Sequence, residues 1–394
     1  MKNQQSKSQK AMFGSFTNLF NAEFQILHLL SLFLFFGCGV IFGIILGFSL
    51  KDFSFNLKIT QLSQPPSSSS SPSPSLPPGF SRVWLREYLK VPNIKHDMEE
   101  EELLWRASLS PKIHEYPFER VPRVAFLFLV KGPVLLAPLW EKFFEGYEDL
   151  YSIYVHSSPS FNEAQGEPPG SVFYGRRIPR KEVQWGDVNM IEAERRLLAN
   201  ALLDFSNKRF VLLSESCIPL FNFTTIYSYL MNSAQNFVEV KDVEGSVGRG
   251  RYIRKMGSKI TLNQWRKGSQ WFQTDRELAF EMVSDKTYFP LFQKYCKGRC
   301  YSDEHYLPTF VHIKFPEKSA NRTLTWVDWS YGGAHPRKFI RTGVTVELLR
   351  DLRGGYTCQY NGNSTNVCYL FARKFMPNTV DRLLRYAAKE LHIR

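Results

Sequence analysis

An uncharged stretch of 22 residues near the N-terminus, residues 29–50, constrains this chain more than any other feature of its sequence. As a helix it would be about 33 Å long, which is enough to cross the hydrocarbon core of a bilayer. It is longer than the apolar region of about 7–15 residues in a cleavable signal peptide, and the charged pair Lys51-Asp52 follows it directly. The sequence therefore predicts an uncleaved membrane anchor, and a buried core helix is the less favoured alternative.

The charges before this stretch predict its orientation. Lys2, Lys7 and Lys10 precede it, and Glu23 is the only acidic residue there. The positive-inside rule then leaves residues 1–28 in the cytosol and places the rest of the chain in the lumen. We expect a single-pass type II protein of the Golgi membrane. The formal net charge of +13 suits nucleic acid, an anionic membrane surface or an anionic small molecule such as a nucleotide diphosphate, and the luminal location argues against nucleic acid.

Glycosylation triplets and cysteines agree with a luminal domain. Acceptor triplets begin at Asn222, Asn321 and Asn363. The cysteines beyond the predicted anchor are odd in number, so at least one thiol is left without a partner in the chain. They are Cys217, Cys296, Cys300, Cys358 and Cys368. The neighbouring pairs 296/300 and 358/368 are candidate disulfides, but the sequence leaves their connectivity open. No paired CxxC or HxxxH spacing indicates a zinc site.

A Ser- and Pro-rich segment at residues 64–78 separates the predicted anchor from the rest of the chain. Such a composition cannot bury a core and is typical of a stiff linker. We therefore predict a linker and stem over residues 51–120 and a luminal domain over residues 121–394. Apolar residues at helical spacing predict short amphipathic helices at 82–109, leading into that domain.

Three apolar runs with helical segments between them predict an α/β domain. The runs are residues 123–130, 150–156 and 209–214, and the helical segments are 134–144 and 188–205, the second with Asp187 as its N-cap. This β-α-β-α-β order predicts a Rossmann-like, mostly parallel sheet with flanking helices. Ligands of such sheets bind beyond the carboxyl ends of the strands, which makes Glu215, after the third run, a candidate ligand-binding residue.

Further along, local signals predict helix starts. Residues 274–277 read as a capping box in which Thr274 opens a helix over 278–283. Ser302 is the expected cap of a short apolar helix that carries Asp303 and Glu304 in its first turn. A last helix is predicted over residues 379–391.

Several familiar chemistries are excluded because their motifs are missing. The chain has no P-loop, no GxGxxG and no Gly-x-Ser-x-Gly nucleophile elbow. It also lacks the Asp-x-Asp pattern with which many sugar-nucleotide enzymes hold a divalent metal. If the protein binds a nucleotide sugar, we expect Lys and Arg side chains rather than a metal to neutralise the diphosphate.

Three segments carry residues suited to chemistry, and each has an ordinary structural alternative. Residues 301–305 place two carboxylates at a helix start, which is also a common stabilising device. Residues 326–337 combine Trp, Gly, His and Arg, which suits a sugar or a base but also a core. Residues 369–375 set two cations among aromatic residues, as an edge strand also does.

In this order the segments resemble one family. The phrases are 123–129 (RVAFLFL), 150–156 (LYSIYVH), 214–220 (SESCIPL), 267–272 (KGSQWF), 303–306 (DEHY), 326–330 (WVDWS), 332–336 (GGAHP) and 370–375 (LFARKF). Together they resemble the core-2/I-branching β-1,6-N-acetylglucosaminyltransferases, glycosyltransferase family 14, in their plant branch. The resemblance covers residues 121–375.

The resemblance implies a GT-A-type fold and an inverting, metal-independent transfer of a sugar from a UDP-sugar to a glycan or glycoprotein. N-acetylglucosamine is the family's usual sugar. The family's catalytic base falls on Glu304, its diphosphate-binding cations fall on Arg337 and Lys374, and its acceptor-side residues fall on Trp326, Glu239 and Arg251. One position departs from the family: His156 stands where animal members carry an aspartate that helps to hold the nucleoside, so the donor's identity stays open.

Two other classes of function are alternatives. One is a non-catalytic Golgi sugar-binding or scaffold protein on the same fold. The other is a metal-dependent luminal hydrolase that uses His156, His305 or His335, although no HExxH or comparable spacing supports it. Within the glycosyltransferase interpretation, Asp303 competes with Glu304 for the role of base. Since consecutive helical residues point about 100° apart, we expect Glu304 to face the acceptor and Asp303 to serve stability.

Overall fold

The computed structural model describes residues 36, 87, 90–109, 116 and 118–393. The chain divides into two compact units, Met1–Phe80 and Ser81–Arg394, and all of the labelled helices and strands lie in the second. The predicted anchor at 29–50, apart from Phe36, and the Pro-rich linker at 64–78 lie outside the described residues. None of the helices formed by the described residues is both long enough and apolar enough to span a bilayer.

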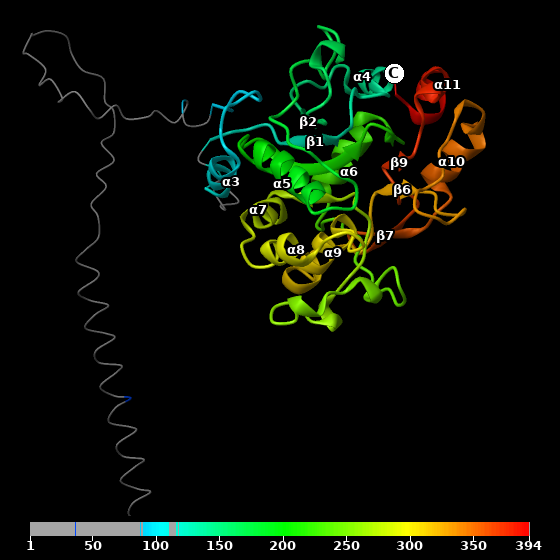
Figure 1. Ribbon diagram of the computed structural model, residues 1–394. Helices are drawn as coiled ribbons and strands as arrows, with labels where there is room; N and C mark the ends of the chain where they lie inside the picture. Colours follow the sequence, from blue (N-terminus) through cyan, green and yellow to red (C-terminus); the bar gives the residue numbers. More distant parts are fainter. Residues whose placement is uncertain (1–35, 37–86, 88–89, 110–115, 117, 394) are drawn as a thin grey trace, which may run out of the picture. The chain divides into compact units, whose positions relative to one another are not determined.

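A four-stranded sheet with the order β2-β1-β3-β5 forms the centre of the second unit (Figure 1). Its strands are β1 (Arg123–Leu129), β2 (Tyr151–His156), β3 (Asn207–Ser214) and β5 (Gln273–Asp275). The first three are parallel, and β5 runs antiparallel to β3. The three predicted strands are therefore confirmed, and so is a mostly parallel sheet with flanking helices.

Alternate side chains of these strands enter two separate cores, one on each face of the sheet. On β1, Phe126 and Phe128 point to one core, whereas Ala125 and Leu127 point to the other. The first core is covered by α4 (Ala137–Phe144), α6 (Phe223–Asn232), α10 (Val346–Gly354) and α11 (Val380–Tyr386), which Ala387–Leu391 continues. The second is covered by α5 (Asn189–Leu202), α7 (Arg276–Ser284), α8 (Phe289–Tyr295) and α9 (Ser302–Lys314). Burial on both faces explains why the strands are continuous apolar runs.

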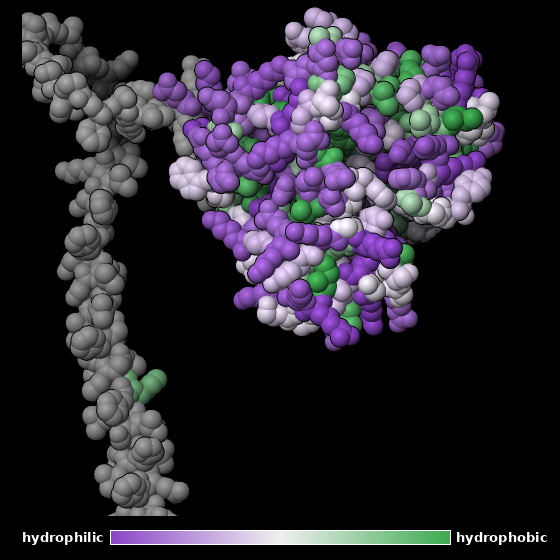
Figure 2. Space-filling view, viewed as in Figure 1, coloured by the Kyte–Doolittle hydropathy of each residue, from purple (hydrophilic) through white to green (hydrophobic). Residues whose placement is uncertain are grey.

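Helix α3 (Glu100–Ser108) belongs to the same folded unit. Its Leu103 and Ala107 are buried in the core that α5 and α7 share. The amphipathic helix predicted in this part of the stem therefore packs on the domain. The face of the unit seen in Figure 2 is mostly hydrophilic, with hydrophobic residues in small separate patches.

A second sheet, with the order β4-β9-β6, extends the fold beyond the end of β3. Its strands are β4 (Ile218–Pro219), β6 (Thr325–Val327) and β9 (Phe371–Arg373). Because β4 follows β3 after a short turn and pairs with β9, this sheet brings segments 325–327 and 371–374 beside the carboxyl end of β3. A hairpin of β7 (Cys358–Tyr360) and β8 (Asn363–Thr365) lies between β6 and β9 in the sequence.

Cysteine pairing follows sequence proximity. Cys296 bonds to Cys300 and Cys358 to Cys368. Cys217 is the free cysteine in the part of the chain that the structure describes, and it is buried.

Three predicted helix caps are wrong. Helix α5 begins after Val188, so Asp187 is not its N-cap. Helix α7 is capped by Asp275, whose carboxylate accepts from Leu278 N at 2.8 Å, while Thr274 belongs to β5. Helix α9 begins after Tyr301, and the Ser302 hydroxyl is buried without a hydrogen-bond partner.

Candidate active site

A cleft of about 680 Å³ opens where the parallel strands of the central sheet end. Lys131 follows β1, His156 ends β2 and Glu215 follows β3, and all three residues line the cleft. The second sheet contributes Trp326 and Lys374, and the first turn of α9 contributes Glu304. The cleft therefore lies at the edge of the sheet where ligands of α/β proteins bind.

Two cations hold the carboxylate of Glu304. Arg251 Nη1 donates to its Oε2 at 2.6 Å, and Lys267 Nζ lies 3.0 Å from the same oxygen. Among the described residues, Oε1 has no hydrogen-bond partner. The side chain is 23% exposed. A half-buried carboxylate with one fixed and one free oxygen can accept a proton from a hydroxyl group that enters the cleft.

The backbone around Glu304 is fixed by a neighbouring backbone bridge. Lys241 and Lys267 exchange both backbone hydrogen bonds, at 2.8 and 2.9 Å, and Gly268 N then donates to Glu304 O at 2.9 Å. Gly268 must be a glycine, because a Cβ there would lie 1.8 Å from Glu239 O. These backbone hydrogen bonds hold Lys267 close to Glu304.

Asp303 lies next to Glu304 but in a different environment. It is 7% exposed, and its Oδ1 is buried without a hydrogen-bond partner. Burial and, secondly, the charge of Glu304 raise the pKa of Asp303 to about 6. Burial also raises the pKa of the Glu194 carboxyl on α5, to which Gln270 Nε2 donates at 2.9 Å. Asp303 is therefore partly protonated near neutral pH.

The two predicted diphosphate-binding cations lie on adjacent segments. Phe339 N donates to Lys374 O at 2.8 Å, so segment 337–339 runs beside segment 374–376. Lys374 lines the cleft, and burial, with help from Arg373, lowers its pKa. No described residue forms an ion pair with the Lys374 ammonium group. A half-buried cation among other cations is stabilised by a bound anion.

Arg337 occupies a different position from Lys374. It is not among the residues that line the cleft, although its neighbours His335 and Pro336 are. Its guanidinium lies 3.5 Å from Asp328 Oδ2 and packs against Tyr331. Its side chain is 41% exposed.

The predicted acceptor-side residues also gather at this cleft. Trp326 and Glu239 line it, and Arg251 reaches it through Glu304. Trp326 Nε1 donates to the Tyr356 hydroxyl at 3.0 Å. Glu239 is paired with Lys241, its Oε1 lying 2.5 Å from the ammonium nitrogen.

His156 is fully buried at the floor of the cleft. Arg196 Nη1 lies 3.0 Å from its Nε2, and Arg196 in turn pairs with Glu100 of α3. Because a guanidinium can only donate, Nε2 is the acceptor and the ring proton lies on Nδ1. Burial, with the charge of Arg196, lowers the pKa of His156 to about 3. The imidazole is thus neutral at any physiological pH.

The three histidines of the hydrolase alternative do not come together. His305 lies in the interior, stacked on Trp265 with its Nδ1 2.8 Å from Arg266 O, whereas His335 is exposed. Within the described ranges, no group of three or more His, Cys, Asp or Glu side chains could hold a metal ion.

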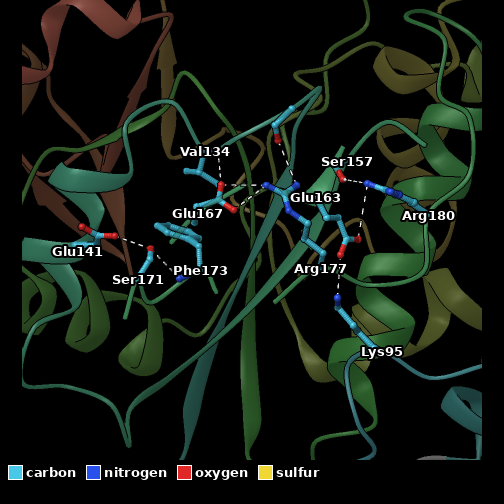
Figure 3. Close-up of polar contacts among 11 residues, drawn as sticks. Lys95, Val134, Glu141, Ser157, Glu163, Glu167, Ser171, Phe173, Arg177 and Arg180 are labelled. Atoms are coloured by element: carbon cyan, nitrogen blue, oxygen red, sulfur yellow. Dashed lines mark hydrogen bonds and ion pairs between the residues drawn. The ribbon is translucent and has the colours of Figure 1, made fainter. Parts of the chain in front are cut away.

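Two buried or half-buried ion pairs fasten the long segment after β2 to the rim of the cleft (Figure 3). The Glu167 carboxylate accepts from Val134 N at 2.7 Å and pairs with Arg177 at 2.8 Å, and Arg177 Nη1 donates to Gly132 O. These bonds hold the loop that follows β1, which includes Lys131. Arg180 reaches both Ser157 and Glu163, and Glu163 binds Lys95 at 2.8 Å.

Lys131, Lys267 and Trp185 are among the cleft residues that were not assigned a role from the sequence. Lys131 follows an apolar run, and its place at a strand end was the available signal. Lys267 opens one of the phrases that resemble the family, but its pairing with Glu304 depends on the backbone bridge to Lys241. Trp185 lies in an irregular segment, where no periodicity points to its position.

The glycosylation triplets differ in exposure. Asn321 and Asn363 are exposed. Asn222 is half-buried and caps α6, its Oδ1 accepting from Thr225 N at 3.0 Å.

Comparison with known proteins identifies the family. The model of the Core-2/I-Branching enzyme family matches residues 124–353. A rice protein (Oryza sativa subsp. japonica) named Glycosyltransferase BC10 is 35% identical over 297 residues, which cover 64% of this chain and 73% of that protein. The family match includes Glu304 and Arg337 and ends before Lys374.

The fold, the cleft and these matches define the class of the protein, which is that of the glycosyltransferases. The chain belongs to the Core-2/I-Branching enzyme family, and the expected membership and plant branch are both confirmed.

Proposed function

We propose that this protein is an inverting, metal-independent glycosyltransferase that moves a sugar from a UDP-sugar to a hydroxyl group of a glycan or glycoprotein. The observation that carries the proposal is the pairing of two groups in one cleft: a carboxylate with a free oxygen, Glu304, and a cation without an ion-pair partner among the described residues, Lys374.

Inversion requires one in-line displacement. Glu304 Oε1 accepts the proton of the acceptor hydroxyl as the hydroxyl oxygen attacks C1 of the donor sugar. Arg251 and Lys267 hold Oε2, so the carboxylate does not need to reorient during the reaction. The bond between C1 and the diphosphate breaks, and the electron pair leaves with the diphosphate.

Cationic side chains stabilise the charge that grows on the leaving diphosphate. Lys374 is in place, and Arg337 exchanges Asp328 for the phosphate oxygens. Support for a reaction without a metal comes from the sequence, which has no Asp-x-Asp motif, and from these cations. The family's usual sugar, N-acetylglucosamine, and its β-1,6 linkage are the first to test.

Further residues that line the cleft are suited to binding the acceptor. Trp326 offers a ring face to the acceptor, and Glu239, with Glu215 at the end of β3, offers carboxylate oxygens to its hydroxyl groups.

We place the catalytic domain in the Golgi lumen, with residues 29–50 as a type II anchor. The two disulfides support an oxidising compartment. Protease treatment of sealed microsomes should leave the domain intact and endoglycosidase-sensitive. Digestion of the domain in unopened vesicles would show that the topology is wrong.

The test of the reaction uses the full-length protein in detergent, a panel of UDP-sugars, and UDP release as the readout, with EDTA present throughout. We expect turnover with at least one donor. Glu304→Gln should lower the rate at least about 100-fold while UDP affinity is retained, because a positioned base contributes about 10²–10⁴-fold. Lys374→Ala should weaken UDP binding.

An exposed ion pair whose residues do not line the cleft provides matched controls. Glu277→Gln and Lys318→Ala remove one partner each of a pair at 2.6 Å and should leave both rate and affinity unchanged. An absolute need for manganese would refute the metal-free reaction. A near-normal rate in Glu304→Gln would refute the base, and normal function of every variant in cells would favour the non-catalytic alternative.

A further inference from the structure

Two half-exposed tryptophans stand at the mouth of the cleft. Trp185 is 49% exposed and Trp329 is 50% exposed, and both line the cleft. By contrast, Trp140, Trp265 and Trp271 are buried. An exposed indole in a concave site presents a flat apolar face with a polar edge, which is the usual form of a stacking surface for a ligand.

The loop that carries Trp329 is closed at its base. Arg337 N donates to Asp328 O at 2.9 Å, a backbone bond that does not depend on where the Arg337 side chain points. Inside the loop, Ser330 N donates to Asp328 Oδ1 and Gly332 N donates to Trp329 O, each at 2.9 Å. These bonds fix the course of residues 328–337, so Trp329 is presented by a defined turn.

Trp185 comes from a different part of the chain and joins the same rim. Its ring lies 5.0 Å from that of His335, which belongs to the loop of Trp329. On its other side, the Trp185 ring lies 5.2 Å from that of Tyr301, on which Arg251 stacks at 4.1 Å.

This chain of contacts ends at the proposed base, since Arg251 binds Glu304 at 2.6 Å. Tyr301 and Arg251 do not line the cleft themselves, but they connect the rim to Glu304, where the attacking hydroxyl must lie. An acceptor whose hydroxyl reaches Glu304 can extend along this rim. Lys374, the cation proposed to bind the donor, directly follows β9 of the second sheet.

We propose that Trp185 and Trp329 form a stacking subsite for an additional sugar ring of the acceptor, next to the ring that carries the attacking hydroxyl. The acceptor class is then an oligosaccharide or polysaccharide chain rather than a single sugar or an amino-acid hydroxyl. The inference rests on the proposed function for the identity of the site. A pyranose ring has an apolar C–H face that fits an indole and hydroxyl groups at its edge that stay in water.

Binding of oligosaccharides of increasing length tests this inference without any need for turnover. The probes are the β-1,4-linked oligosaccharides of xylose, glucose and galactose, each from one to six units, titrated into the full-length protein in detergent with UDP present. Calorimetry gives the affinity. Wild-type protein should bind at least one series more tightly as the chain lengthens. Trp185→Ala and Trp329→Ala should each weaken hexasaccharide binding about tenfold, which corresponds to the loss of one stacking contact.

Trp105 provides the matched control, because it is 62% exposed on α3 and does not line the cleft. Trp105→Ala should bind every probe as the wild type does. Monosaccharide and UDP affinities should be the same in all four proteins, and their thermal melts should coincide.

Three results would overturn the inference: wild-type affinity that does not increase with length in any series, hexasaccharide binding unchanged in both cleft variants, or a loss of UDP affinity in them, which would assign the rim to the nucleotide. Failure of the proposed function looks different. In that case length-dependent binding persists and depends on both tryptophans, but no donor is turned over.

Discussion

The substitution Asp303→Asn should stabilise the protein at neutral pH. Asp303 is buried, its Oδ1 has no hydrogen-bond partner, and its pKa is raised from 3.8 to about 6. The cause is burial first and the charge of Glu304 second. A difference of about 2 pKa units corresponds to roughly 3 kcal/mol between the two protonation states.

The direction in which the free energy of unfolding changes with pH follows from the number of protons that the folded and unfolded states bind. Between about pH 4 and pH 6 the folded protein holds a proton on Asp303 that the unfolded chain has released. The free energy of unfolding therefore falls as the pH rises through this window, and the full deficit of roughly 3 kcal/mol is present above it. Asparagine has the same size and no charge, so it removes the deficit. From the sequence, Asp303 was expected to stabilise the protein, so its replacement was expected to be destabilising. The structure predicts the opposite effect.

Urea denaturation at a series of pH values measures the effect. The variant should match the wild type near pH 4 and exceed it by up to about 3 kcal/mol at pH 7. Asp149→Asn is the control, because that side chain is 93% exposed, and its curve should follow the wild type. The reasoning fails if Asp303→Asn is less stable than the wild type at pH 7, or if the difference between them does not depend on pH.

Two further predictions concern the frame of the cleft. Arg177→Met leaves the Glu167 carboxylate buried without its ion-pair partner, since both side chains are 6% exposed. It should lower the free energy of unfolding, measured by urea denaturation, by about 3–5 kcal/mol, and adding Glu167→Leu should recover most of this loss. Equal losses in the single and double variants would contradict this. Gly268→Ala places a Cβ 1.8 Å from Glu239 O and should abolish cooperative unfolding, whereas a normal melt would show that the backbone can move aside.

The central sheet could be predicted because its strands are buried on both faces. A run such as residues 123–129 has no amphipathic helical pattern and no charge after its first residue, so few other structures suit it. The helix starts could not be predicted to the residue. Thr274 fits a capping box by sequence, but pairing of β5 with β3 takes it into the sheet, and Asp275 then caps the helix.

The candidate site could be predicted only in part. Glu304 was found because acidic residues at a helix start are visible in the sequence, and the resemblance selected it over Asp303. The difference between these neighbours, one half-exposed between two cations and the other buried, comes from packing against α5 and segment 267–270. No local pattern records a contact between residues that lie 53 positions apart, as Arg251 and Glu304 do.

Charge is distributed unevenly along the cleft, and this distribution favours donor binding in one part and acceptor binding in another. Glu239 pairs with Lys241 and Glu304 with Lys267, the two lysines that exchange backbone hydrogen bonds, and Asp303 is partly protonated. At the other end, Lys131 and Lys374 have no ion-pair partner among the described residues. An anionic diphosphate is therefore favoured where β1 and β9 end, and an uncharged sugar chain is favoured near α9. In the proposed inverting reaction the proton acceptor and the leaving group lie on opposite sides of the reacting carbon, and this division of charge agrees with that arrangement.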